Sequence, residues 1–214
     1  MTEETRRCAY LEALARLQPR WDHDLNDDLG AVKIQIDVLI AMLGAERGQT
    51  IEIAKLTPVL DRSMNAIRKF QNGISAQLRI RRGNGEDHFD LAGHVTALGA
   101  LLGACARLQL RVACSVVAPE KPVWIEGGEP ALREAVTIAA VEMLFLAREG
   151  ESVAMRLDAD GERAALRIEG PRRPAESTPW FTAVRETLAK FEGRVEAGDG
   201  LSLDLIIPMA AVPR

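Results

Sequence analysis

The chain has 214 residues, of which 47% are hydrophobic and 27% charged, a composition typical of globular proteins and not of disordered or fibrous ones. Its net charge of −4 gives no general attraction to nucleic acid. The apolar runs are short or interrupted by charges, and the first residues lack the apolar core of a signal peptide. The sequence therefore favours a cytoplasmic protein that binds neither nucleic acid nor membrane. Three scattered cysteines without CxxC spacing predict neither a disulfide framework nor a zinc site.

Two long amphipathic helices are predicted in the first part of the chain. The first covers residues 5–43, with Pro19 as a kink or restart, and residues 44–50 connect it to a second helix at about residues 53–81. The apolar residues of the first helix recur at spacings of four and three, like the seam of helices that pack together: Leu25, Leu29, Val32, Ile36, Leu39 and Leu43. The second helix has a matching face of Leu60, Met64, Ile67, Phe70, Ile74 and Leu78. A hairpin of two such helices leaves part of each stripe exposed, so we expect a two-fold homodimer that closes a four-helix bundle.

The pattern changes at Gly83-Asn84-Gly85, which divides the chain into a helical hairpin domain at residues 1–83 and a second domain at residues 86–214. Helices are predicted at residues 91–107, 129–148 and 179–191, and strands at residues 108–116, 123–125, 152–157, 164–169, 194–197 and 201–207. Three helices on one face of a mixed sheet make an α/β sandwich. The fold class predicted for the whole chain is therefore α+β.

His23 is the candidate functional residue. It lies in the acidic run that precedes the apolar seam, and at 100° per residue it is turned away from that seam, so its ring is expected at the surface. A neutral imidazole nitrogen is a good nucleophile near pH 7. We do not expect a metal site made by His23 with Asp22, Asp24 and Asp27, because this spacing is not a recognised ligand set.

The run His23-Asp24-Leu25-Asn26-Asp27-Asp28-Leu29 resembles the H-box of bacterial sensor histidine kinases, in which an acid follows the phosphoacceptor histidine. The order of elements also fits that family, and Leu132-Arg133-Glu134-Ala135-Val136 is similar to the start of its ATP-binding helix. The resemblance implies a dimeric hairpin that carries the phosphoacceptor, followed by an ATPase-like domain.

The chain departs from the family where the family binds ATP. Ile138 and Glu142 stand in place of the asparagines that hold magnesium, and Glu169-Gly170-Pro171-Arg172-Arg173-Pro174 replaces a glycine-rich loop. A second glycine motif is replaced by Thr178-Pro179-Trp180-Phe181, and the intervening lid is only about eight residues long. Prolines offer no N–H group to a phosphate. The resemblance therefore implies the family's fold without ATP binding and with no cofactor of its own.

The resemblance implies a histidine phosphotransferase that relays phosphate between response-regulator receiver domains, which supply the magnesium. The resemblance implies that His23 is the phosphoacceptor and that Asp24 orients its ring, while Asn26 and Asp27 are expected on the same helical face. Asp27 stands where the family usually has a threonine or asparagine that positions water. The receiver domain is expected to dock on the first helix around Asp27 and Lys33 and on the second near Arg68 and Gln71.

Two alternatives stay open from the sequence. One is a non-catalytic dimeric adaptor, or pseudokinase, that binds regulators or a kinase. The other is an atypical ATP-dependent histidine kinase that uses Glu142 to hold magnesium.

Overall fold

The structure is a computed structural model that describes residues 3–45, 53–82, 88–126, 129–160, 163–197 and 202–208. The predicted connection between the first two helices and the predicted boundary at Gly83-Asn84-Gly85 lie largely or wholly outside the described residues. Contacts divide the chain into two compact units. The helical unit is Pro19–Gln77, and the sheet unit combines Met1–Gln18 with Leu78–Arg214. This division differs from the predicted boundary, because both ends of the hairpin group with the sheet.

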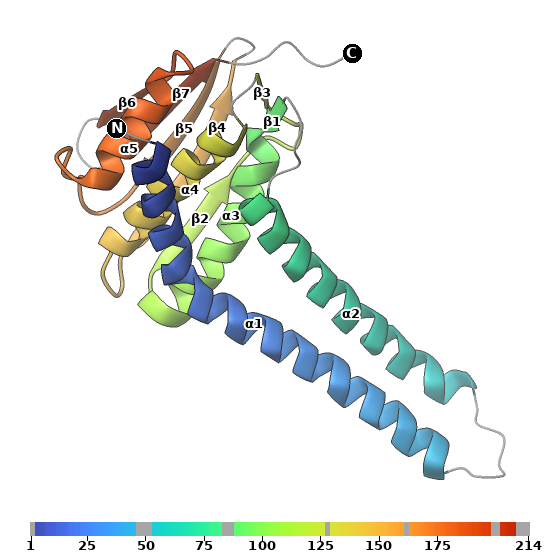
Figure 1. Cartoon of the computed structure of the whole chain (residues 1–214). Helices are drawn as coiled ribbons and strands as arrows, with labels where there is room; N and C mark the ends of the chain where they lie inside the picture. Colours follow the sequence, from blue (N-terminus) through green and yellow to red (C-terminus); the bar gives the residue numbers. More distant parts are fainter. Residues whose placement is uncertain are drawn as a thin grey trace. The chain divides into compact units, whose positions relative to one another are not determined.

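Two long helices account for the helical unit and extend beyond it at both ends (Figure 1). They are α1 (Glu3–Ala45) and α2 (Ile53–Arg82), close to the predicted ranges. Pro19 lies inside α1, which continues through it as one helix and does not restart. Within the helical unit, α1 and α2 run side by side in opposite directions, as expected of a helical hairpin.

The sheet unit contains one mixed five-stranded sheet and a separate pair of short strands. The order of the larger sheet is β2-β4-β5-β7-β6, in which β2 and β4 are parallel and all other neighbours are antiparallel. Its strands are β2 (Ala113–Val117), β4 (Ser152–Ala159), β5 (Arg163–Glu169), β6 (Arg194–Ala197) and β7 (Ser202–Pro208). The short antiparallel pair is β1 (His88–Asp90) with β3 (Trp124–Glu126).

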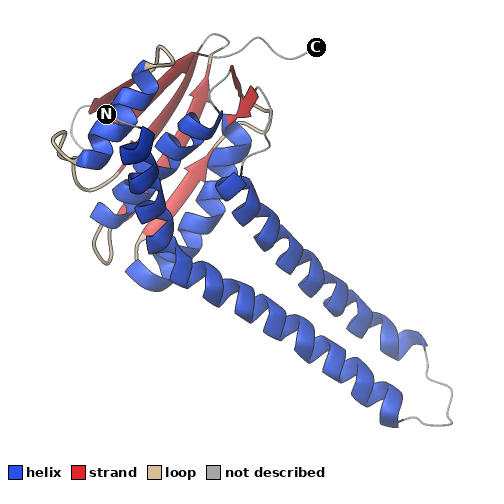
Figure 2. Ribbon diagram, in the orientation of Figure 1, coloured by secondary structure: helices blue, strands red, loops and turns tan. Residues whose placement is uncertain are grey.

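Three helices cover one face of this sheet (Figure 2): α3 (Leu91–Cys105), α4 (Glu129–Leu146) and α5 (Pro179–Ala189). Side chains alternate along β4 and β5, so that one face of each strand is buried and the other exposed. The buried set is Val153, Met155, Leu157, Ala164, Leu166 and Ile168. The predicted α+β class and the single covered sheet face are therefore confirmed.

The predicted strand at residues 108–116 begins too early. Residues Ala106–Leu110 continue α3 as a short π-helix, and the strand starts only at Ala113. Arg111 ends the helical segment with a left-handed φ of 53°, and the N–H of Val112 donates to the carbonyl of Ala106 at 2.9 Å. Apolar residues at every second position do not specify a strand when they also fit the last turn of an apolar helix.

Within the described residues, Leu91–Leu110 is the one helical stretch long and apolar enough to cross a membrane. Half of its most apolar window is buried inside the protein. Its fully buried side chains include Leu91, Val95, Leu98 and Leu102. This pattern is typical of a core helix between a sheet and its neighbours.

Gly99 and Gly103 of α3 provide a matched test of this packing. A Cβ atom at Gly99 would lie 2.3 Å from Cγ2 of Val116, whereas one at Gly103 meets nothing within 4 Å. We expect Gly99→Ala to lower the free energy of unfolding by about 1–3 kcal/mol through overpacking. Gly103→Ala should raise it by about 0.5–1 kcal/mol through helix propensity. Urea denaturation measures both, and equal effects would contradict the close approach of α3 to β2.

Candidate functional site

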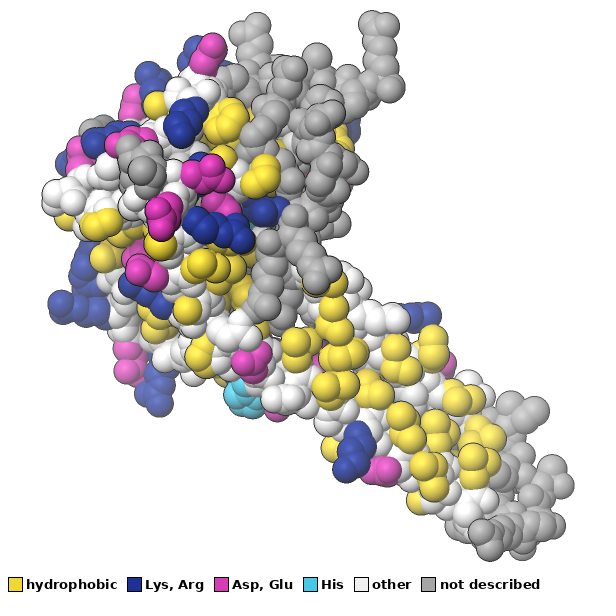
Figure 3. Space-filling view, viewed as in Figure 1, with side chains coloured by type: hydrophobic (Ala, Val, Ile, Leu, Met, Phe, Trp, Pro, Cys, Tyr) yellow, Lys and Arg dark blue, Asp and Glu magenta, His cyan; other side chains and the backbone are white. Residues whose placement is uncertain are grey.

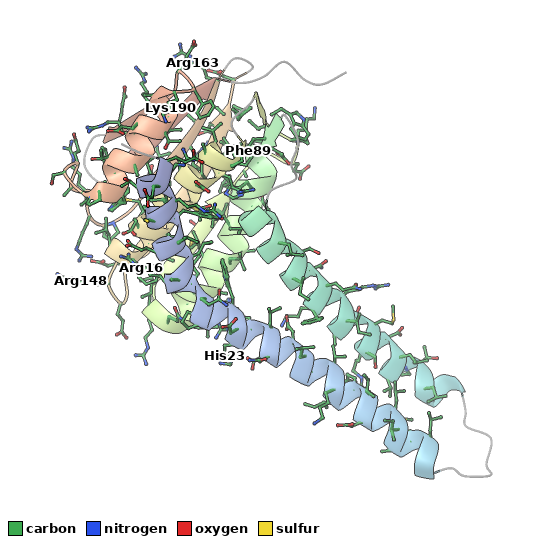
Figure 4. The ribbon with its side chains drawn as sticks, in the orientation of Figure 1. Arg16, His23, Phe89, Arg148, Arg163 and Lys190 are labelled. Carbon is green, nitrogen blue, oxygen red and sulfur yellow. The ribbon has the colours of Figure 1, made fainter. Side chains whose placement is uncertain are left out.

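His23 is on an exposed face of α1, as its place in the sequence predicted. Its side chain is 59% exposed. Figure 4 shows it on the outer side of α1, away from α2. The acidic residues around it favour a solvated helix face, while the apolar seam faces elsewhere. The ring is therefore accessible to another protein.

The carboxylate that contacts the ring belongs to Asp27. Its Oδ1 lies 3.1 Å from Nδ1 of His23, one helical turn along the same face. Asp24, to which the sequence analysis assigned this contact, is instead paired with Arg20 at the preceding turn. The reason is the helical period, since a neighbour at i+1 is rotated by about 100° whereas one at i+4 is nearly in line.

An ion pair that the sequence analysis missed joins α1 to α2 at the residue that follows Asp27. Asp28 is only 9% exposed, and its Oδ1 accepts a hydrogen bond from Nζ of Lys69 at 2.5 Å. A Cβ atom at Gly73 would lie 3.8 Å from the other carboxylate oxygen, so α2 passes close to Asp28. The Asp28 carboxylate raises the pKa of Lys69 above its usual 10.5. The signal in the sequence was an acid next to an apolar seam with a lysine between Ile67 and Phe70 on the facing helix.

All four residues predicted to contact a partner are exposed in the structure: Asp27, Lys33, Arg68 and Gln71. Asn26, which was predicted to belong to the catalytic site, is exposed as well. Sequence reasoning missed two apolar residues on the same side. Ile34 and Val38 are 61% and 39% exposed, and at 100° per residue they fall within about 60° of His23 around α1. The acidic face that carries His23 thus continues along the helix as an apolar strip.

The predicted seam is also exposed in the single chain. Leu29, Ile36 and Leu43 of α1 are between 46% and 56% exposed, and Leu60 and Met64 of α2 fall in the same range. Figure 3 shows apolar side chains gathered along this unit. Exposed apolar side chains gathered on one surface are typical of a contact with another molecule.

Two positions of α4 at which the family resemblance expects magnesium ligands have other surroundings in the structure. Ile138 is fully buried, and Glu142 accepts a hydrogen bond from Nη1 of Arg16 at 3.0 Å. In the described part of the chain, no three His, Cys, Asp or Glu side chains are grouped so as to hold a metal ion.

The loop that follows β5 is fixed by Arg172. Its guanidinium donates to the carbonyl of Leu146 at 2.6 Å and to the two carboxylate oxygens of Glu151 at 2.7 and 2.8 Å. The hydrogen bond from Arg172 lowers the pKa of Glu151. A bidentate ion pair therefore holds this loop against Glu151, just before β4, and the hydrogen bond to Leu146 holds it against the end of α4.

Comparison with solved structures identifies the fold. No protein-family profile matches the sequence, and no curated protein is significantly similar to it. A histidine kinase from Burkholderia phymatum aligns with 14% identity over 99% of this chain and all of that chain, with a TM-score of 0.51. The mycobacterial sensor histidine kinase MprB aligns with 18% identity over 58% of this chain and 98% of its own, with a TM-score of 0.45. The first alignment shows that this chain has the same α+β fold, a helical region followed by a small sheet domain.

Replacing Lys69 tests the ion pair under the site. Lys69→Met keeps the side-chain length but leaves the Asp28 carboxylate buried without its cation, which costs about 1–2 kcal/mol after discounting for the exposure of Lys69. Because the folded pKa of Lys69 is raised, the contribution is complete below pH 10.5 and is lost as the pH rises through the folded value. Urea denaturation measures the effect, with the exposed Lys33→Met as control. Equal losses in both variants would contradict it.

Proposed function

We propose that this protein is a histidine phosphotransferase of two-component signalling, which relays phosphate between response-regulator receiver domains without using ATP. The observation that carries the proposal is the exposed His23 whose Nδ1 lies against a carboxylate, on a chain with the fold of a histidine kinase. The partners of such a relay are cytoplasmic receiver domains, so a cytoplasmic location is part of the proposal.

The arrangement of the His23 ring suits phosphoryl transfer. When Nδ1–H donates to Asp27, the lone pair is on Nε2, the nitrogen further from the helix. Nε2 attacks the phosphorus of the receiver's aspartyl phosphate, the bond from phosphorus to the aspartate oxygen breaks, and the aspartate leaves as a carboxylate. The proton on Nδ1 stays hydrogen-bonded to Asp27 throughout. Magnesium bound by the receiver neutralises the transferring oxygens, and the reverse reaction delivers the phosphoryl group to a second receiver.

Asp27 is therefore the residue that we propose orients the ring. It fixes the tautomer and raises the basicity of Nε2, as a carboxylate behind a histidine does elsewhere. Asp24 is held in an ion pair with Arg20 one helical turn away, and Asn26 offers an exposed amide to the partner.

The docking surface that we propose uses exposed residues of both helices of the hairpin. We propose that the receiver domain contacts Asp27 and Lys33 on α1 and Arg68 and Gln71 on α2, and that Ile34 and Val38 supply the apolar part. Apolar residues at the centre of an interface contribute more to affinity than charged residues at its rim.

We propose that the protein is a homodimer. Two hairpins that bury their exposed seams against each other would close a four-helix bundle, and each large apolar side chain that becomes fully buried contributes about 1.5–3 kcal/mol.

The dimer is tested by a charge placed in the seam. Ile36→Asp should convert a dimer into a monomer, because a carboxylate at this position would be buried without a partner. Light scattering measures the mass, and the matched change Ile40→Asp shows whether any acid on this side has the same effect. A monomeric parent protein of full stability argues against the bundle.

No nucleotide cofactor belongs to this proposal. Three features support a function without a nucleotide: the buried Ile138, the Glu142–Arg16 ion pair and the loop that Arg172 fixes. A protein that bound ATP through these elements would first have to break these contacts.

The phosphotransferase is tested by transfer from a labelled receiver domain. Phosphate should appear on the protein as an acid-labile, base-stable label that His23→Ala abolishes without loss of stability, since the exposed side chain leaves no cavity. Asp27→Ala should slow transfer by about 10²-fold or more because ring orientation is lost, and Asp24→Ala should slow it less. Quenched-flow labelling measures each rate.

Three outcomes would change the proposal. Label that persists in His23→Ala places the acceptor elsewhere. A protein that binds receivers without being labelled is an adaptor. Label that comes from ATP and magnesium alone, and is lost in Glu142→Ala, makes it a kinase.

A further inference from the structure

The first turns of α1 belong to the sheet unit, and we refer to residues 3–18 as the N-terminal arm. Tyr10, Ala13 and Leu17 of the arm are at most 1% exposed. Their spacing of three and four puts them on one face of the helix. On α4, every residue from 132 to 141 is buried. A helix that is buried on all sides packs against the sheet on one face and against another element on the opposite face. For α4, that other element is the arm.

Ion pairs attach the arm to α4 at both ends. Glu134 is 2% exposed, and its carboxylate accepts from Nε of Arg6 at 2.9 Å and from Nη1 of Arg7 at 2.5 Å. Ten residues later in the arm, Arg16 binds Glu142, two turns further along α4. Between them the hydroxyl of Tyr10 donates to the carbonyl of Ile80 at 2.7 Å. A buried carboxylate that loses its guanidinium partners is strongly disfavoured, so these contacts hold the arm closed.

Pro19 follows the arm immediately, inside α1 and at the boundary between the two units. A proline in a helix interior removes one backbone hydrogen bond and clashes with the preceding turn. The helix nevertheless continues through Pro19 into the turn of Arg20–Asp24, which contains His23. Contacts on the flanking segments must therefore offset the local cost, and on the upstream side these are the contacts of the arm.

We propose that the docked N-terminal arm is a latch that keeps α1 helical through Pro19 and so holds the turn that carries His23. The latch regulates the site described above and rests on the proposed function for its consequence. When the arm leaves α4, the helix loses its upstream anchor and frays at Pro19. The His23–Asp27 contact, which depends on helical spacing, is then lost as well.

The latch is tested in the full-length protein by reversing its charges. Arg6→Glu with Arg7→Glu should increase amide hydrogen exchange at least tenfold in residues 7–17 and also in residues 20–24, while β4 and β5 keep their protection. Adding Glu134→Arg should restore protection to both segments. Lys121→Glu with Lys190→Glu makes the same change in net charge at exposed positions of the sheet unit and should alter neither segment. Where the double variant fails to fold, Arg16→Glu with its rescue Glu142→Arg is milder, because Arg16 is 44% exposed.

Pro19→Ala separates the latch from a general loss of stability. In the charge-reversed protein it should return protection to residues 20–24 but not to residues 7–17, because alanine no longer weakens the helix at that point. The rate of labelling of His23 should fall with release of the arm and recover with Pro19→Ala. Unchanged protection of residues 20–24 after the arm has opened overturns the latch, since the buried Trp21 would then hold that turn by itself. If the parent protein is never labelled, the proposed function fails while the exchange result still decides the latch.

Discussion

The whole structure depends on α1 presenting its apolar residues on different sides at different points of its length. Its first turns present Tyr10, Ala13 and Leu17 to the sheet unit, whereas its later turns present an apolar seam along the hairpin. An α-helix has one period, so a change of apolar face requires a change in the residues that occupy each face. The acidic run around His23 lies where one pattern ends and the other begins. This is the part of the helix that can expose a polar face without losing core contacts.

Charged residues hold together elements that apolar packing alone would leave adjustable. Asp28 and Lys69 join α1 to α2, and Glu134 joins α4 to the arm through two arginines. The cost of removing a carboxylate from water offsets most of what its cationic partner contributes, so a buried ion pair adds little net stability. Packing arrangements that leave the buried carboxylate without a cation are nevertheless strongly disfavoured. Such pairs therefore fix the register in which helices meet. They also make each register sensitive to the loss of a single cation.

The sequence was sufficient for most of the elements and for the exposed histidine, because both follow from periodicity. The seam of α1 and the alternation in β4 and β5 are local patterns, and the position of His23 follows from counting residues around a helix. What periodicity cannot supply is the partner of each side chain. The carboxylate that reaches His23 was assigned to Asp24 from the family resemblance, and the arm was counted with the hairpin because its helix is continuous. The contacts of Glu134 join residues more than 120 positions apart, which no local pattern encodes.

Arg172 shows how one side chain can limit which sequences this fold accepts. Its guanidinium binds the last carbonyl of α4 and both oxygens of Glu151, so it joins the end of a helix, the start of β4 and the loop after β5. A lysine carries a similar charge but has no planar fork, and its single nitrogen cannot meet all three acceptors in this geometry. A homologue with lysine at this position would therefore need a different loop after β5. The identity of this one residue should report whether a related chain keeps the same loop after β5.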